Sequence, residues 1–172
     1  MSDIEESLRA TVNRIADHLK AAANRELYLV EGEYEKIEYL EGWKEDKRKE
    51  KEEEFRKLHP EDKFDKEETG CDTYEEWMNE EIGEIEEIGD QEEMSVSDYL
   101  EKESLGDIRF EVDTDKEIHG GRVLVGYGGP NIWITEGEVQ GYWGSKTVKV
   151  MLDSDTRSAI MDYLGEMWDT IK

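Results

Sequence analysis

Cysteine, proline and histidine are scarce in this sequence of 172 residues. The one cysteine, Cys71, excludes an intramolecular disulfide and fits a reducing cytosol. Three scattered histidines and one cysteine give no paired ligand spacing, so no zinc site is expected. His59 and Cys71 also lack the flanking signature of a cysteine nucleophile and its base. A carboxylate pair for hydrolysis remains open among 47 acidic residues, but none stands out, and we expect neither an enzyme nor a cofactor.

Long hydrophobic runs are also missing. No stretch approaches 18 consecutive apolar residues, and residues 1–19 have no apolar signal region, so neither a membrane span nor secretion is expected. Hydrophobic residues make up 35% of the chain, below the usual roughly 45–50% of globular domains. Five Trp, eight Tyr and three Phe still provide material for a modest core. We expect a cytoplasmic protein that does not contact membranes.

Positive charge is in short supply. The chain has 22 basic against 47 acidic residues, a formal net charge of −25. Such a surface repels both nucleic acid and anionic membranes, which excludes direct binding to either. The charge is unevenly spread, because residues 67–101 hold 15 acids and no base, whereas residues 44–66 hold nine of each. The segment 67–101 therefore carries three-fifths of the net charge.

Apolar residues at helical spacing predict helices in the first half of the chain. Ser2 and Glu5 form a capping-box pattern at the start of the stripe Ile4, Leu8, Val12, Ile15 and Leu19. A second helix is predicted from the stripe Leu27, Val30, Tyr34, Ile37 and Leu40, although two glycines, Gly32 and Gly42, weaken it. Residues 44–68 are nearly all charged, with i,i+4 pairs of opposite sign. They predict a projecting helical arm that ends before His59-Pro60, with a linker after it.

The acidic segment predicts a further helix that begins at a capping box of Thr73 and Glu76. If residues 67–101 formed one helix, it would be about 52 Å long at ~1.5 Å per residue. Its acids would then be spaced about 3.5 Å apart, close to the ~3.4 Å between phosphates on one strand of B-DNA. The residues predicted to bind a partner are Tyr74, Glu75, Glu76, Trp77, Glu80, Glu81, Glu84, Glu86, Glu87, Asp90, Glu92 and Glu93. Tyr74 and Trp77 are either anchors of that surface or core residues.

After Gly106 the apolar period changes from 3.6 to 2. Ile108, Phe110 and Val112 alternate with charged residues, which predicts a half-buried strand. Further strands are predicted at 122–127, 131–135, 138–143 and 147–152, and a last helix, capped by Asp153 or Ser154, has the apolar face Ile160, Leu164, Met167, Trp168 and Ile171. The predicted class is α+β: N-terminal helices, then a small antiparallel sheet closed by a C-terminal helix. We expect a helical region with a charged arm at 1–70, an acidic helical segment at 71–106, and the sheet with its helix at 107–172.

Two motifs resemble ligand-binding loops but lack essential residues. Asp113-x-Asp115-x-Glu117 begins like a calcium loop, yet the positions that need a glycine and a final acid hold Ile118 and Leu124. The glycine-rich segment 126–130 leads into a strand, and no Lys-Ser/Thr follows it, so it lacks the features of a phosphate loop. We predict a tight turn there.

The segments Gly128-Gly-Pro-Asn-Ile132 and Tyr142-Trp-Gly144, with the aromatic helix 163–168, resemble a family of small acidic proteins from phages and conjugative elements of gut bacteria. The resemblance covers roughly residues 95–172. It implies a mobile-element origin, a bacterial host cell and, for some members, opposition to host defence. It supplies no catalytic residues.

Charge and resemblance together suggest an acidic, DNA-mimic-like inhibitor of a bacterial immune nuclease. The expected target is an RNA-guided CRISPR effector of the single-protein type, with anti-restriction activity as the next choice. The inhibitor would block the basic DNA-recognition surface of the nuclease, which must neutralise phosphates. Two alternatives remain open: an acidic adaptor or chaperone for a basic protein partner, and a charged surface that serves only solubility. The oligomeric state is left undetermined by the sequence.

Overall fold

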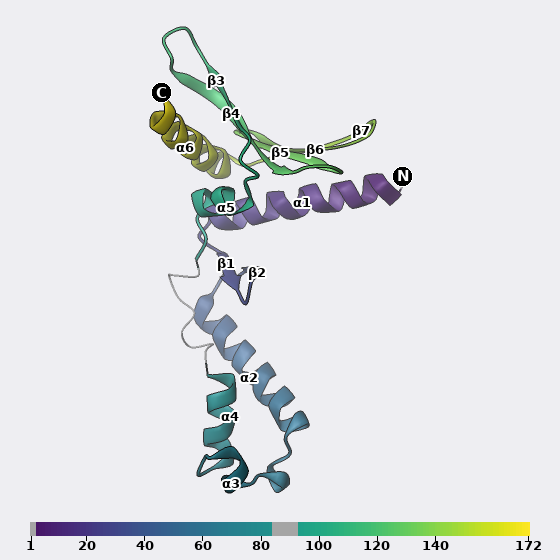
Figure 1. Cartoon of the computed structure of the whole chain (residues 1–172), viewed down its shortest axis with the longest axis vertical. Coiled ribbons are helices and arrows are strands. Elements are labelled where there is room, and N and C mark those ends of the chain that lie inside the picture. The colour runs from purple at the N-terminus through teal and green to yellow at the C-terminus, as the bar shows by residue number, and fades with distance from the viewer. Residues whose placement is uncertain (1–2, 84–92) are drawn as a thin grey trace. The chain divides into compact units, whose positions relative to one another are not determined.

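The structure, a computed structural model, describes residues 3–83 and 93–172 (Figure 1). The chain forms two compact units, which we call the sheet unit (residues 1–36 and 93–172) and the helical hairpin unit (residues 37–92). The class is α+β, as predicted. These units cut the chain differently from the expected segments 1–70, 71–106 and 107–172, because the first helix packs on the sheet. The hairpin unit is thus an insertion within the sheet unit.

Five antiparallel strands make the sheet, and their order along the sheet is their order along the chain. The alternation predicted after Gly106 is confirmed at Ile108 and Phe110, whereas Val112 is 42% exposed, because the strand register shifts between Glu111 and Val112. The predicted strands are confirmed. Their bounds are β3 (Ile108–Val112), β4 (Ile118–Gly126), β5 (Asn131–Thr135), β6 (Glu138–Trp143) and β7 (Lys146–Met151). A row of aligned apolar residues crosses all five strands on the core face: Ile108, Val123, Ile134, Val139 and Val150.

Three helices cover that core face: α1 (Asp3–Ala23), α5 (Val96–Glu103) and α6 (Ser154–Ile171). Helix α1 contacts β6 and β7, and both α5 and α6 contact β4. All three helices lie on one side of the sheet (Figure 1). Leu8, Val12 and Leu19 of the predicted α1 stripe are fully buried, whereas Ile4 is 47% exposed.

The C-terminal helix follows its prediction. The Asp153 side chain accepts a hydrogen bond from the Thr156 backbone N–H at 2.9 Å, which caps α6. Leu164 is fully buried, and the Trp168 ring lies 5.4 Å from the Phe110 ring. The Trp168 indole N–H also donates to the backbone oxygen of Lys116 at 3.0 Å. The exception is Ile171, which is 62% exposed at the end of the helix.

The second predicted helix is wrong: residues 27–36 form a β-hairpin of β1 (Leu27–Val30) and β2 (Glu33–Lys36). Its two loop residues, Glu31 and Gly32, both have positive φ, at 52° and 82°. This is the geometry of the two-residue turn whose twist matches paired antiparallel strands. Leu27 and Tyr28 of β1 are buried, whereas the residues of β2 are exposed or half-buried.

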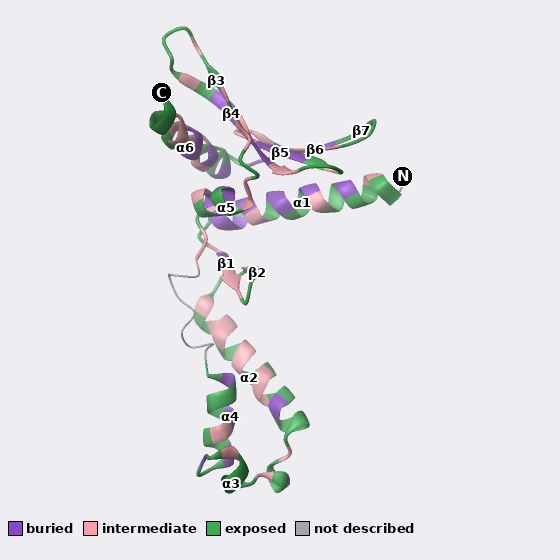
Figure 2. Ribbon diagram, viewed as in Figure 1, coloured by how far each residue is buried: buried purple, intermediate pink, exposed green. Residues whose placement is uncertain are grey.

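The hairpin unit contains α2 (Leu40–Leu58), a single 3₁₀ turn (Glu61–Lys63), α3 (Lys66–Thr69) and α4 (Tyr74–Ile82). The predicted arm is helical and ends before His59-Pro60, as expected, although the helix begins earlier than Lys44. Figure 2 shows α2 mostly exposed or half-buried, with one buried residue, Phe55. Phe55 packs with α4, so the charged helix does have a core of its own.

Candidate functional site: the acidic surface of the helical hairpin

Helix α4 carries the described part of the predicted partner-binding set, and an aromatic core holds it in place. Tyr74, Met78 and Ile82 recur every four residues and are buried together with Phe55 of α2. The Phe55 ring lies 5.5 Å from Tyr74 and 5.0 Å from Trp77. The Tyr74 hydroxyl donates to the backbone oxygen of His59 at 2.5 Å. Tyr74 is therefore a core residue, whereas Trp77 is half-buried at the edge of the core.

The first turn of α4 is built from local hydrogen bonds. Thr73 Oγ1 accepts from the backbone N–H of Glu76 at 3.0 Å, as the predicted cap requires. The Glu76 carboxylate then accepts from the backbone N–H of Asp72 at 3.1 Å. This differs from a full capping box, in which the Glu76 carboxylate would accept from the backbone N–H of Thr73.

Cys71 is buried beside the same helix, and its environment disfavours nucleophilic chemistry. The thiol donates to Glu80 Oε2 at 3.1 Å. This hydrogen bond, with burial and the surrounding carboxylates, raises the pKa of Cys71 to about 11. The thiol is therefore protonated at neutral pH, and a thiolate nucleophile is not populated there.

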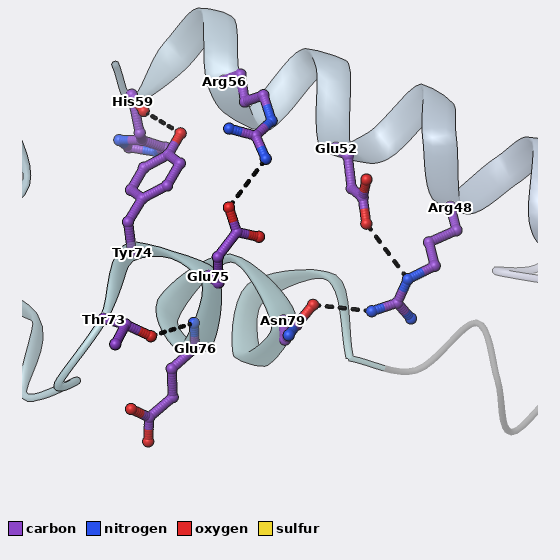
Figure 3. A network of polar contacts seen from close by, with 9 residues as sticks. All are labelled: Arg48, Glu52, Arg56, His59, Thr73, Tyr74, Glu75, Glu76 and Asn79. Atoms are coloured by element: carbon purple, nitrogen blue, oxygen red, sulfur yellow. Dashed lines mark hydrogen bonds and ion pairs between the residues drawn. The ribbon is translucent and has the colours of Figure 1, made fainter. Parts of the chain in front are cut away.

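Two side chains of α4 face α2 and are paired with it (Figure 3). Glu75 Oε1 accepts from the Arg56 guanidinium at 3.1 Å, and Asn79 Oδ1 accepts from Arg48 at 2.8 Å. Arg48 also forms an ion pair with Glu52 of its own helix at 3.3 Å. Glu75 is therefore committed to the hairpin and is the least available of the predicted glutamates on α4.

Part of the positive charge of α2 is paired within α2 itself. Three lysines pair within α2 over one helical turn: Lys44 with Glu41, Lys47 with Glu50, and Lys49 with Glu45. Residues 37–92 hold 23 acids and nine bases, a formal net charge of −14. Within the described chain, Glu76, Glu80 and Glu81 are exposed and form no ion pair with a lysine or arginine. We call these three residues the acidic surface of α4.

The other predicted residues do not extend this surface into one long helix. A left-handed Gly70 (φ 74°) ends α3, Thr73 starts α4, and α5 begins at Val96. The described residues of 67–101 therefore do not form the one helix that the phosphate-like spacing assumed. Glu93 belongs to the sheet unit, where it bridges to Tyr28 and binds Arg25 at 2.9 Å. Five predicted acids lie outside the described residues: Glu84, Glu86, Glu87, Asp90 and Glu92.

In the calcium-like motif, the Asp113 carboxylate binds groups of the neighbouring residues of the chain. Asp113 Oδ1 accepts from the backbone N–H groups of Asp115 and Glu117, both at 2.9 Å, and Oδ2 contacts His119 Nε2 at 2.9 Å. These hydrogen bonds, led by that from Glu117, hold the pKa of Asp113 below its ordinary value. Across residues 3–83 and 93–172 no group of three potential metal-ligating side chains occurs.

Sequence reasoning missed a cavity of about 750 Å³ in the sheet unit. His18, Tyr34 and Tyr99 form a three-ring cluster on its wall, with centroids 4.9 to 5.7 Å apart. Tyr34 donates to Glu103 Oε1 at 2.5 Å, and the Tyr99 hydroxyl lies 3.2 Å from His18 Nδ1. These residues come from α1, β2 and α5, so no local motif could have signalled them. The predicted glycine-rich turn, residues 126–130, lines the same cavity.

Comparisons with protein-family models, with curated proteins and with solved structures gave no match. Every helix in the described part of the chain is too short or too polar to cross a lipid bilayer.

Proposed function

We propose that this protein binds the basic nucleic-acid-binding surface of another protein through the acidic surface of α4, and that it inhibits a bacterial immune nuclease in this way. The proposed target is a single-protein RNA-guided CRISPR effector, or else a restriction enzyme. The observation that carries the proposal is the charge imbalance of the helical hairpin unit: Lys44, Lys47 and Lys49 pair within α2, whereas Glu76, Glu80 and Glu81 form no ion pair with a lysine or arginine of the described residues.

The chemistry of the partner follows from this charge. A DNA-recognition surface concentrates Arg and Lys because it must neutralise phosphates, and it is therefore complementary to a rigid carboxylate cluster. The aromatic core under α4 holds the backbone of that cluster, which reduces the entropy lost on binding. The resemblance of residues 95–172 to mobile-element proteins favours a defence nuclease among the possible basic partners.

The division of the acidic segment into the separate helices α3, α4 and α5 also favours a second candidate function. A compact patch on α4, a helix of nine residues, does not reproduce a ladder of phosphates and would fit many basic surfaces. An adaptor or chaperone for a basic protein is therefore the alternative function, and it differs in that nuclease activity would be untouched.

The test compares two triple charge reversals with the same change in net charge. The first is Glu76→Lys, Glu80→Lys and Glu81→Lys on α4. The control is Glu101→Lys, Asp162→Lys and Glu166→Lys, three exposed acids of α5 and α6 in the sheet unit. Each protein is assayed for capture of purified defence nucleases, with and without guide RNA, and for inhibition of DNA cleavage over a salt series.

We expect the α4 reversal to lose inhibition by at least tenfold and the control to keep it. Inhibition by the wild type should weaken as salt rises, because the Debye length falls from about 30 Å at 0.01 M to about 8 Å at 0.15 M. Equal inhibition by both triple variants would refute the role of α4. Tight, salt-sensitive binding of a basic protein without inhibition of any nuclease would support the adaptor instead.

A further inference from the structure

The sheet face opposite the helices carries a basic and aromatic cluster that is unusual for so acidic a chain. Strand alternation places Arg109, Arg122, Trp133 and Gln140 on this outer face, because their neighbours Ile108, Val123, Ile134 and Val139 point into the core. Arg109 and Arg122 are directly opposite each other on β3 and β4. In the described part of the sheet unit, the helices all pack on the other face of the sheet (Figure 1).

Both guanidinium groups lie against the same indole. The guanidinium carbon of Arg109 is 5.0 Å from the centre of the Trp133 ring, and that of Arg122 is 4.3 Å from it. Stacking on an aromatic ring orients the planar guanidinium. Trp133 is in turn only 9% exposed. The indole therefore holds two cations side by side at the surface of the sheet.

These two cations are poorly neutralised by the protein. Like charges directly opposite each other on neighbouring strands destabilise a sheet. Arg109 contacts Asp107 at 3.4 and 3.5 Å, at the long end for a hydrogen bond. Within the described chain, Arg122 forms neither a hydrogen bond nor an ion pair with a side chain, although the sequence has 47 acidic residues.

A hollow of about 600 Å³ is lined by both arginines, and two of its three glutamates, Glu136 and Glu138, accept hydrogen bonds from other groups. Glu136 accepts from the backbone N–H of Gly121 at 3.1 Å. Glu138 accepts from Gln140 Nε2 at 2.7 Å and lies 3.9 Å from Lys149. Gly120 leaves the space that the Glu136 carboxylate fills, because a Cβ there would approach it to 2.7 Å. The hollow thus presents both guanidinium groups together with the carboxylates of Glu111, Glu136 and Glu138, and Thr135 lies directly opposite Arg122.

We propose that this hollow binds a small amphoteric ligand of the amino-acid class, with its carboxylate on Arg109 and Arg122 and its ammonium toward Glu111 and Glu136. A guanidinium fork matches a carboxylate through two parallel hydrogen bonds. A single negative charge relieves the repulsion between the two arginines. A dianionic phosphate would face three glutamates in the same hollow, which disfavours it.

The test uses three probes at constant ionic strength: glycine, acetate and inorganic phosphate. Each is titrated into the full chain while two-dimensional NMR follows the arginine Nε–H and tryptophan indole N–H signals. We expect saturable shifts of Arg109, Arg122 and Trp133 with glycine, with a dissociation constant on the order of 1 to 10 mM. Acetate should bind more weakly because it lacks the ammonium, and phosphate more weakly still.

Three variants test whether glycine binds at Arg122. Arg122→Gln and Arg122→Lys should both weaken glycine binding by at least tenfold, since the lysine keeps the charge but loses the planar fork. The control, Arg9→Gln, removes an exposed arginine of α1 outside the hollow and should bind like the wild type. Folding of each variant is checked by its amide spectrum.

The proposal is overturned if glycine produces no saturable shift in the wild type up to 100 mM, or if folded Arg122→Lys binds as well as the wild type. Preference for phosphate over glycine would also reject the amino-acid class and would leave only a general anion site. None of these outcomes depends on the acidic surface of α4, so failure here and failure of the proposed function are distinguishable.

Discussion

At the scale of single residues, Gly141 fixes how closely α1 approaches the sheet. A Cβ at this position would lie 2.6 Å from Val12 Cγ2 and 2.7 Å from Leu8 Cδ1. Both neighbours are fully buried, so neither has room to move. We predict that Gly141→Ala destabilises the protein by about 1 to 3 kcal/mol, as overpacking does in other cores. Chemical denaturation followed by circular dichroism measures this loss.

Gly165 provides the matched control for Gly141→Ala. It lies in α6, and a Cβ there would meet no atom within 4 Å. Gly165→Ala should therefore stabilise the protein by about 1 kcal/mol through helix propensity alone. A loss of stability from Gly165→Ala, or none from Gly141→Ala, would contradict the packing described here.

His18 provides a prediction about pH. Burial is the main cause that lowers its pKa below the ordinary 6.5, and the nearby Arg14 adds to it, whereas Glu103 and Asp17 act in the opposite direction. The unfolded chain therefore takes up the proton more readily than the folded one. Stability that depends on neutral His18 is complete above pH 6.5 and is lost as the pH falls through the lower folded value.

NMR titration of the His18 ring should give a midpoint below 6.5, and Arg14→Gln should raise that midpoint. His18→Gln should also make the melting temperature depend less on pH between 7.5 and 5. A midpoint above 6.5 would contradict the buried placement of His18.

At the scale of elements, the hairpin unit depends on one side chain of α2. Phe55 is 7% exposed and packs with Tyr74 and Met78, whereas Leu58 of the same helix is 75% exposed. Phe→Ala changes in cores cost about 3 to 5 kcal/mol, which is much of the stability of a small unit. We predict that Phe55→Ala abolishes amide protection in residues 40–82 and leaves residues 108–151 protected. Leu58→Ala should leave both regions unchanged in hydrogen-exchange mass spectrometry.

The elements also show what the sequence could and could not predict. The sheet and α6 were predictable because their burial alternates with the period of a strand or of a helix, and because Asp153 is a strong cap. The hairpin of β1 and β2 was not, because Leu27, Val30 and Tyr34 also match helical spacing and the turn depends on positive φ at Glu31, a residue that rarely adopts it. The helix that starts at Thr73 was predictable from its cap, whereas the left-handed Gly70 that separates it from α3 is not revealed by the apolar pattern.

The candidate sites also include features that the sequence could predict and features that it could not. The acidic surface of α4 was predictable from composition. That Glu75 is not part of this surface could not be predicted, because it depends on the positions of Arg56 and Arg48 on α2. The pairing of Arg109 with Arg122, and the cavity around His18, depend on strand register and on helices distant in sequence. A single sequence carries no signal for such long-range contacts.

At the scale of the whole molecule, the hairpin unit is removable in principle. It leaves the sheet unit after Lys36 and returns at Glu93, where the Met94 backbone N–H bonds to Leu27 at 2.8 Å. We predict that replacement of residues 37–92 by a short Gly-Ser linker leaves the sheet unit folded, with unchanged NMR shifts in β5 and β6. The deleted protein should lose nuclease inhibition but keep glycine binding. An unfolded deletion variant would show that the two units are not independent.

The insertion also has a consequence for folding kinetics. Helix α1 must dock on β6 and β7 with the whole hairpin unit lying between them in sequence, so the early chain closes a long loop. Closure cost changes by about 0.6 kcal/mol for each doubling of loop length. A linker of roughly seven residues in place of residues 37–92 shortens the connection between α1 and β6 by less than half, so it would lower the closure cost by about 0.5 kcal/mol. If the helical hairpin unit folds before α1 docks on the sheet, it shortens the effective length of this loop and speeds the docking of α1. The acidic unit would then assist the assembly of the sheet that carries it, and Phe55→Ala would slow refolding of the sheet unit without altering any contact inside it.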